Sequence, residues 1–286
     1  KIFNWIAANS NLGISFVNFV CGLIFTTGLF LYARKSPYPW LALVIAFPIL
    51  ILVVSLGYTR QSAAIGIEFL VLMALERGMF FRSLLLISIG ANFHLTFLSC
   101  SVLLINIFKQ YFLKLRYRTK VIFFLILSLY LAWTLYPYLQ MVNERYLMVY
   151  VLNEYGDSSS GGALIRAIPN SIAAIILLIH RRKFINYDGR HITSIYISIA
   201  IFAVILIIGI LCFPSNTTLL DRFSLYCCPL SIYVLTRCVD LKLLNLTRFS
   251  NTVTIILVSF SYFYGWLLIG THAQYWLPYK NVLYLF

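Results

Sequence analysis

The chain has 286 residues, of which 62% are hydrophobic and only 10% are charged, and its formal net charge is +14. Soluble domains carry about a quarter charged residues, so this chain has too few polar residues to cover a surface exposed to water. Apolar runs of about 20 residues recur along the whole length, and in lipid such runs satisfy their backbone hydrogen bonds as helices. We therefore predict an all-α fold: a polytopic transmembrane helix bundle that forms a single integral membrane domain over residues 1–286.

The basic residues lie in short loops between the apolar runs, a pattern that the preference of Lys and Arg for cytoplasmic loops explains better than nucleic-acid binding does. We therefore expect the lipid bilayer as a partner and no nucleic acid. The cysteines lie in or beside apolar runs without polar ligands around them, which predicts packing residues rather than a disulfide framework or a metal site. They are Cys21, Cys100, Cys212, Cys227, Cys228 and Cys238.

Nine membrane segments are expected along the chain. They cover about residues 12–32, 38–57, 60–76, 83–108, 120–139, 163–180, 192–213, 222–237 and 251–270. The first residue is Lys rather than Met, so we expect this number to be a minimum and N-terminal helices to be missing.

Clusters of basic residues indicate the orientation, because Lys and Arg favour the cytoplasmic side. These clusters lie at 34–35, 77–82, 109–120, 181–190 and 237–248. If every segment crossed once, the segment at 83–108 would join two loops that both belong in the cytoplasm. We therefore predict that it turns back near Gly90 and Asn92, as a re-entrant or broken hairpin with His94 near its tip. The alternative is one long tilted helix.

With this hairpin, four polar segments share the non-cytoplasmic side with His94. They are the turn that holds Arg60, the main outside loop at 140–162, the segment of Asp221 and Arg222, and the outside C-terminal tail at 271–286. A functional site is therefore expected on this side.

Three arginines on this side are candidate ligands for an anion: Arg60, Arg166 and Arg222. The planar fork of a guanidinium suits phosphate or carboxylate, for which Lys is a poor substitute. Arg60 can equally anchor the chain at the membrane border. Asp221 can equally cap a helix start; as a functional residue it would orient Arg222 or act as a base.

His94 is the candidate base because imidazole accepts a proton near neutral pH, although a lone buried histidine is more often a packing residue. Glu68 is about two helical turns deeper than Arg60 and requires a buried polar partner or a water-filled cavity. Four residues of the tail either form an interfacial belt or stack on sugar rings. They are His272, Tyr275, Trp276 and Tyr279.

The common hydrolytic and nucleotide-binding motifs are absent from the sequence, including the Walker A loop, GxSxG and HExxH. What remains is a set of arginines, a histidine, acids and aromatic residues on one predicted face. This composition suits an anionic, partly sugar substrate that enters from lipid.

The sequence resembles the EpsG-like and Wzy-type polymerases that assemble bacterial O-antigen, capsule and exopolysaccharide. The resemblance rests on five segments that span about residues 57–281: GYTRQSAAIG, NFHLTFLS, GGALIR, LLDRFSLY and WLPYKN. It implies a membrane glycosyltransferase that joins undecaprenyl-diphosphate-linked oligosaccharide repeat units at the outer face of the bacterial inner membrane. A chain-length regulator and a flippase are further candidate partners.

On the matching positions, the resemblance implies that Arg60, Arg166 and Arg222 hold the diphosphate, with His94 as the leading candidate base and Asp221 as the second. No cofactor or metal is expected, because lipid diphosphate is already a good leaving group. Three rival functions stay open, of which a non-enzymatic scaffold is the third. A flippase or transporter of lipid-linked oligosaccharide would use a similar cavity, and an O-antigen ligase would share the donor but differ in the acceptor.

Overall fold

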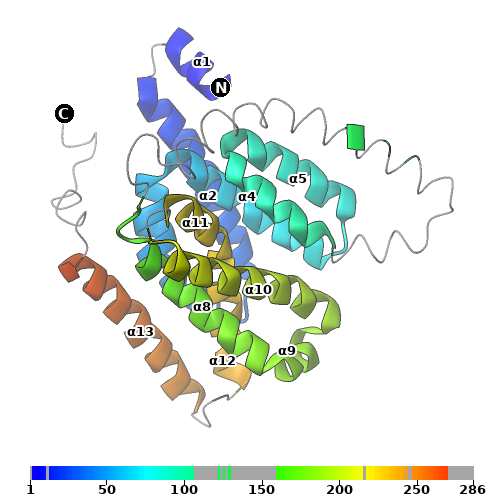
Figure 1. The fold of residues 1–286 in the computed structure, drawn as a ribbon, viewed down its shortest axis with the longest axis vertical. Coiled ribbons are helices and arrows are strands. Elements are labelled where there is room, and N and C mark those ends of the chain that lie inside the picture. Colours follow the sequence, from blue (N-terminus) through cyan, green and yellow to red (C-terminus); the bar gives the residue numbers. More distant parts are fainter. Residues whose placement is uncertain are drawn as a thin grey trace.

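The computed structural model describes residues 2–10, 13–105, 159–214, 217–241 and 247–269, together with positions 122, 125, 128, 129 and 243. All regular secondary structure in these residues is helical (Figure 1), which confirms the all-α prediction. The expected segment at 120–139, most of the outside loop at 140–162 and the tail at 271–286 lie outside the described residues, apart from isolated positions.

The described helices fall into two groups along the chain. The first comprises α1 (Ile2–Asn9), α2 (Gly13–Lys35), α3 (Pro39–Ala46), the π-helix η1 (Phe47–Ser55), α4 (Thr59–Glu76), α5 (Phe80–Phe93) and the 3₁₀-helix η2 (Leu95–Leu104). The second comprises α8 (Ala163–Ile179), α9 (Arg181–Asp188), α10 (Arg190–Cys212), α11 (Thr217–Ser224), the 3₁₀ turn η5 (Leu225–Cys227), α12 (Cys228–Leu241) and α13 (Arg248–Ile269).

Within the described residues, three helices are long and apolar enough to cross a membrane: α2, α10 and α13. The pair α8 and α9 passes the same test but is bent by 83°, which raises the number to four at most. The nine predicted spans are thus not confirmed. The apolar helices at Pro39–Ser55, Phe80–Phe93 and Leu95–Leu104 are shorter than a full crossing.

Helices α2 and α4 lie side by side and run in the same direction. Thr59 Oγ1 donates to Asn18 Oδ1 at one end (3.2 Å), and Lys35 Nζ donates to Glu76 Oε2 at the other (2.7 Å). The backbones approach so closely that a Cβ atom added to Gly28 would lie 2.0 Å from the carbonyl oxygen of a glycine in α4. Small residues permit such close packing, which drives helix association in lipid.

The predicted break at His94 is confirmed. Helix α5 ends at Phe93, His94 has extended backbone angles (φ −146°, ψ 122°), and η2 begins at the next residue. A Cβ added to Gly90 would lie 2.2 Å from the ring of Phe97, so η2 folds back against α5. The single long tilted helix is therefore wrong, and the chain turns at His94.

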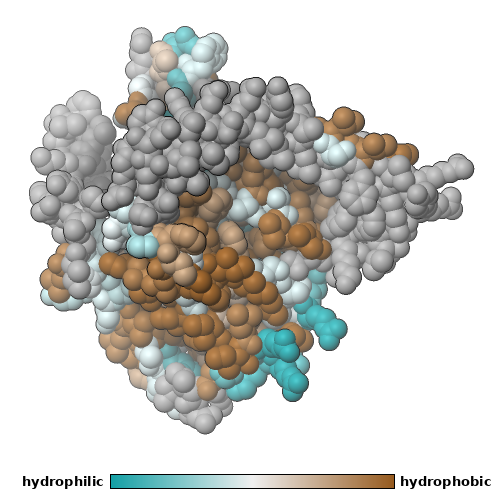
Figure 2. Space-filling model, in the orientation of Figure 1, coloured by the Kyte–Doolittle hydropathy of each residue, from teal (hydrophilic) through white to brown (hydrophobic). Residues whose placement is uncertain are grey.

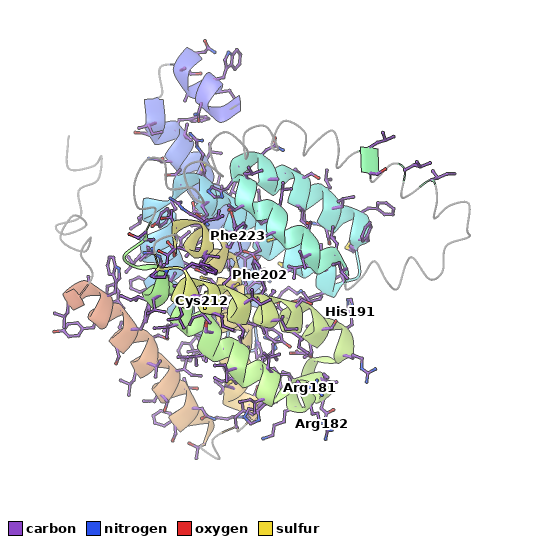
Figure 3. All side chains as sticks on the ribbon, viewed as in Figure 1. Arg181, Arg182, His191, Phe202, Cys212 and Phe223 are labelled. Atoms are coloured by element: carbon purple, nitrogen blue, oxygen red, sulfur yellow. The ribbon has the colours of Figure 1, made fainter. Side chains whose placement is uncertain are left out.

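The bundle has two polar ends with an apolar surface between them. Figure 3 places Arg181, Arg182 and His191 at one end and Cys212 and Phe223 toward the other. In Figure 2 the surface between is hydrophobic, and hydrophilic colour gathers where α9 lies. Exposed apolar side chains of α8 and α10 contribute to this surface, among them Ile172, Ile175, Ile201, Ile205, Ile208 and Leu211. This arrangement suits helices surrounded by lipid.

The end that carries Arg181 is closed by a network of aromatic and charged side chains. Arg237 forms an ion pair with Asp188 and lies 4.0 Å over the ring of Tyr233. That ring stacks at 3.5 Å on Tyr196, whose hydroxyl donates to Glu76 Oε1 (2.7 Å). Lys35 pairs with Glu76 there, and His191 Nε2 lies 3.0 Å from the carbonyl oxygen of Leu75, so the predicted cytoplasmic loops at 34–35, 77–82 and 181–190 lie close together. We call this the basic end.

Candidate functional site

A cavity of about 590 Å³ lies at the end of the bundle opposite the basic end. Three residues singled out from the sequence border it: Arg60, His94 and Arg222. We call it the polar cavity, and its full lining is Asn4, Ile14, Val17, Asn18, Gly57, Tyr58, Thr59, Arg60, Gln61, His94 and Arg222. Residues more than 160 positions apart in the sequence thus share one space.

The first turn of α4 forms one wall of the polar cavity. Thr59, Arg60 and Gln61 are the first three residues of this helix, and the side chain of Arg60 is exposed to the cavity while that of Gln61 is buried. The first N–H groups of a helix lack intrahelical acceptors and carry partial positive charge. A helix start beside an arginine is therefore a favourable place for an anion such as phosphate.

Arg222 is held in the cavity by neutral groups. Its Nη1 donates to Gln61 Oε1 (3.2 Å), and Gln61 Nε2 donates to the carbonyl oxygen of Arg222 (2.8 Å). Its guanidinium lies 4.6 Å from the ring centroid of Tyr58. The ion pairs among the described residues include neither Arg222 nor Arg60. Both positive charges are therefore available to a bound anion.

Arg166 is engaged differently. Its Nε donates to Asp221 Oδ1 (2.9 Å) and its Nη2 to Asp221 Oδ2 (2.6 Å), and both side chains are almost fully buried. Ser160 Oγ also donates to Asp221 Oδ2 (3.0 Å). This bidentate pair joins α8 to α11. Asp221 therefore orients Arg166, and the expectation that it orients Arg222 is wrong.

The alternative role of Asp221 as a helix cap is also wrong. Helix α11 begins at Thr217 rather than at the predicted start of the segment at 222, so Asp221 lies inside it. Adjacent residues project about 100° apart around a helix, which directs Asp221 toward α8 and Arg222 toward the polar cavity.

His94 is fixed through one ring nitrogen. Its Nδ1 lies 2.6 Å from Thr96 Oγ1 and 3.2 Å from the hydroxyl of Tyr226. Thr96 Oγ1 in turn donates to the hydroxyl of Tyr226 (3.3 Å). These partners follow from the break at His94, because η2 brings Thr96 back beside the imidazole. With Nδ1 occupied, Nε2 is the ring nitrogen left for a substrate.

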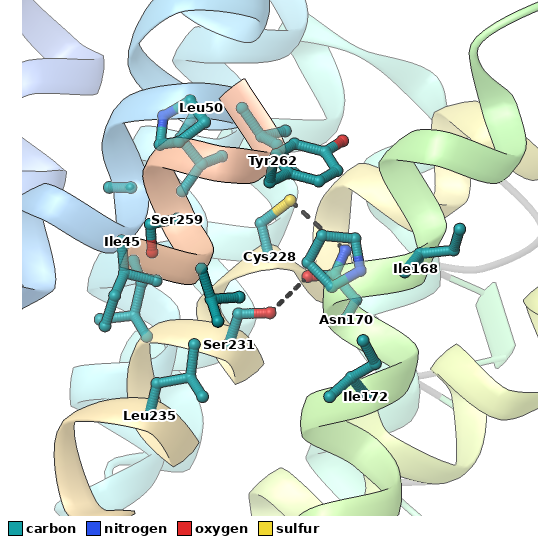
Figure 4. Close-up of a pocket in the computed structure, with 16 residues that line it drawn as sticks. Ile45, Leu50, Ile168, Asn170, Ile172, Cys228, Ser231, Leu235, Ser259 and Tyr262 are labelled. Atoms are coloured by element: carbon teal, nitrogen blue, oxygen red, sulfur yellow. Dashed lines mark hydrogen bonds between the residues drawn. The ribbon is translucent and has the colours of Figure 1, made fainter. Parts of the chain in front are cut away.

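A second cavity of about 140 Å³ lies between η1, α8, α12 and α13, and its lining is almost entirely apolar (Figure 4). Three of its polar side chains are bonded to one another: Asn170 Nδ2 donates to Cys228 Sγ (3.5 Å), and Ser231 Oγ donates to Asn170 Oδ1 (2.8 Å). Asn170 lies one helical turn from Arg166. Such a lining suits a hydrocarbon group close to the arginine-containing region.

The structure adds neighbours of the candidate residues that the sequence did not indicate, namely Tyr58, Thr96, Ser160 and Tyr226. Tyr58 directly precedes the turn of Arg60, and Tyr226 follows Arg222 by four residues, so proximity to the candidate arginines was the available signal. The four tail residues His272, Tyr275, Trp276 and Tyr279 lie outside the described residues. Within the described part of the chain, no group of three or more His, Cys, Asp or Glu could hold a metal ion.

The long apolar helices define a multi-pass helical membrane protein, and a cavity lined by two arginines lies at one end of its bundle. The sequence model of the EpsG family matches residues 1–281, and the chain belongs to this family. The predicted resemblance is thereby confirmed, and membership indicates a polymerase-like function in polysaccharide assembly at the inner membrane. No curated protein and no solved structure matches the chain.

Proposed function

We propose that this protein is a polysaccharide polymerase that joins undecaprenyl-diphosphate-linked oligosaccharide repeat units at the periplasmic face of the inner membrane. The observation that carries the proposal is the polar cavity, where Arg60 and Arg222 lie without carboxylate partners among the described residues and share the space with His94. The cavity is at the end opposite the basic loops, which agrees with a periplasmic opening.

The cationic groups stabilise the leaving group. As the glycosyl bond to the lipid diphosphate breaks, negative charge grows on the diphosphate oxygens. Arg60, Arg222 and the first N–H groups of α4 are fixed donors for this charge. Arg166, whose fork is occupied by Asp221, holds α11 and thereby the position of Arg222 rather than contacting the diphosphate first.

His94 is the proposed base. The acceptor sugar hydroxyl loses its proton to His94 Nε2 as its oxygen bonds to the anomeric carbon, and the bond to the diphosphate oxygen breaks. Asp221 is a weaker candidate because both of its oxygens already accept hydrogen bonds from Arg166 and Ser160. The tail residues 272–279 are proposed to contact sugar rings.

Transport is the rival function, and the two ends of the bundle bear on it. A transporter exposes its site alternately to both sides of the membrane. Here the basic end is closed by Arg237, Asp188 and the stacked rings of Tyr196 and Tyr233. A ligase would use the same donor, so the acceptor must be tested by experiment.

The test is the length distribution of polysaccharide in a strain whose only polymerase is this protein. At matched expression, Arg60→Lys, Arg222→Lys and His94→Ala should lose the long-chain ladder while single repeat units still reach their final acceptor. Arg181→Lys, at the basic end, is the control and should keep the ladder. Lys cannot form the forked contact, and loss of a charged hydrogen bond of about 1.5–3 kcal/mol slows the reaction about 10- to 100-fold.

An unchanged ladder in all three variants would refute the proposed site. Loss of single repeat units together with the ladder would instead indicate a ligase or a transporter.

A further inference from the structure

Glu68 is a buried carboxyl group that the mechanism above does not use. It belongs to α4, is 1% exposed, and lies eight residues from both Arg60 and Glu76. At a rise of about 1.5 Å per residue, it is about 12 Å from each polar end of the helix. A carboxyl group this deep in an apolar bundle is costly, and such residues commonly have a function.

The two oxygens of Glu68 have different surroundings. Oε1 accepts a weak hydrogen bond from Cys100 Sγ (3.8 Å), whereas Oε2 is buried and has no hydrogen-bond partner among the described residues. No cation pairs with Glu68 in the same part of the chain. A buried carboxyl oxygen without a partner is costly, so Oε2 requires a hydrogen-bond partner.

Glu68 borders a small cavity of about 40 Å³ that also touches the hydroxyl-bearing side chains of Ser99, Ser198 and Tyr226. A cavity needs about 10–15 Å³ and two to four polar partners to hold a water molecule. Both conditions are met here. A water at this place would donate to Oε2 and accept from a hydroxyl on the opposite wall.

Tyr226 connects this small cavity to the polar cavity. Its hydroxyl is 3.2 Å from His94 Nδ1 and accepts from Thr96 Oγ1 at 3.3 Å, while its side chain borders the space beside Glu68. One tyrosine thus separates the buried carboxyl from the proposed base.

We propose that Glu68 is a positioning residue that sets the tautomer of His94 through a bound water and Tyr226; this inference rests on the proposed function of His94. Oε2 is the final acceptor of a chain in which the water donates to Glu68 and the hydroxyl of Tyr226 donates to the water. His94 Nδ1–H then donates to Thr96 and Tyr226. The proton is held on Nδ1, and Nε2 presents its lone pair to the acceptor sugar.

Removal of the Glu68 carboxyl group reverses the direction of the hydrogen bonds between Tyr226 and His94. The hydroxyl of Tyr226 is then free to donate to His94 Nδ1, so the imidazole carries its proton on Nε2. A histidine in that tautomer has no lone pair toward the substrate and cannot act as a base there. If Glu68 has this positioning role, its replacement should change the tautomer of His94 while the protein stays folded.

The experiment is nitrogen-15 NMR of the full chain, labelled at histidine and reconstituted in lipid bilayers. The chain has 4 histidines, and the His94 signal is assigned by its loss in His94→Gln. Wild type should show Nδ1–H at His94, and Glu68→Leu should show Nε2–H. Leu fills a similar volume and removes the unpartnered acceptor, so the variant should melt no earlier than wild type. Glu76→Gln, on the same helix, is the control and should leave the His94 signal unchanged.

The activity arm measures polymerisation with purified protein. Glu68→Leu should lower kcat about 100-fold with little change in KM, Glu68→Asp should restore part of the rate, and Glu68→Leu combined with His94→Ala should be no slower than His94→Ala alone. An unchanged His94 tautomer in Glu68→Leu would overturn the positioning role. Because the NMR result does not depend on turnover, a tautomer change without any polymerase activity would reject the proposed function alone.

Discussion

Asp221 and Arg222 are neighbours in the sequence and have separate roles in the structure. Asp221 is buried against Arg166, whereas Arg222 borders the polar cavity beside Gln61 and Tyr58. The buried pair satisfies most of its hydrogen bonds internally and so serves the fold. Arg222 is in none of the ion pairs among the described residues, so its charge is available to a ligand. Substitutions at the two positions should therefore affect different measurements.

We expect Asp221→Asn to destabilise the protein by about 3–5 kcal/mol, because it leaves the guanidinium of Arg166 buried without its counter-charge. Thermal unfolding in detergent should show a clearly lower Tm. Arg222→Lys is the matched control on the same helix turn, and it should lose polymerisation while its Tm stays near that of wild type. Equal Tm values for wild type and Asp221→Asn would show that the pair contributes little to stability.

At the scale of the helices, glycine residues allow close packing between neighbouring elements. Gly28 and Gly66 let α2 and α4 meet backbone to backbone, and Gly90 makes room for the ring of Phe97 where η2 folds back on α5. The first contact places Asn18 and Arg60 at the same end of the bundle. The second brings His94 to that end. The polar cavity thus depends on helix packing as well as on its own side chains.

Gly28→Ala should weaken the protein markedly, since the new methyl group would lie 2.0 Å from a backbone oxygen of Gly66 and the helices must separate. Overpacking of this kind costs about 1–3 kcal/mol. Gly22→Ala is the control in the same helix, because a Cβ there meets nothing within 4 Å. Comparison of the two Tm values tests the contact, and a wild-type Tm for Gly28→Ala would contradict it.

At the scale of the whole molecule, the two polar ends lie at opposite ends of the bundle, and the proposed reaction belongs to the end with the polar cavity. The basic end carries Arg181 and Arg182, and the polar cavity at the other end carries Asn18. Glu76 follows Arg60 by sixteen positions in α4, which separates the ends by about 24 Å. This is close to the thickness of the hydrocarbon core of a bilayer.

In a cysteine-free background, Asn18→Cys should react with a membrane-impermeant maleimide in intact cells with a permeable outer membrane. Arg182→Cys should react only after the inner membrane is opened, because basic residues favour the cytoplasm. The extent of labelling is read by a mass shift on a gel. Labelling of both positions from outside, or of Arg182→Cys alone, would invert or reject the proposed orientation.

Much of the candidate site was predictable from the sequence because it depends on local properties. Apolar runs require helices in lipid, Gly90 and Asn92 mark a weak point before His94, and the order of the basic clusters requires a turn between them. Arg60, His94 and Arg222 could therefore be assigned to one side. The segment at 222–237 was predicted less well, since α11, η5 and α12 divide it and its helical part begins at Thr217.

The sequence by itself determined that this protein is an all-α membrane protein of the EpsG family with Arg60, His94 and Arg222 at one end, because hydropathy and charge act along the chain. Only the tertiary structure decided which side chains contact one another in the site. Arg166 pairs with Asp221 across 55 positions, and Tyr226 reaches both His94 and the cavity of Glu68. A charged or polar side chain has several possible partners in the sequence, and the packing of the helices determines which of them it contacts.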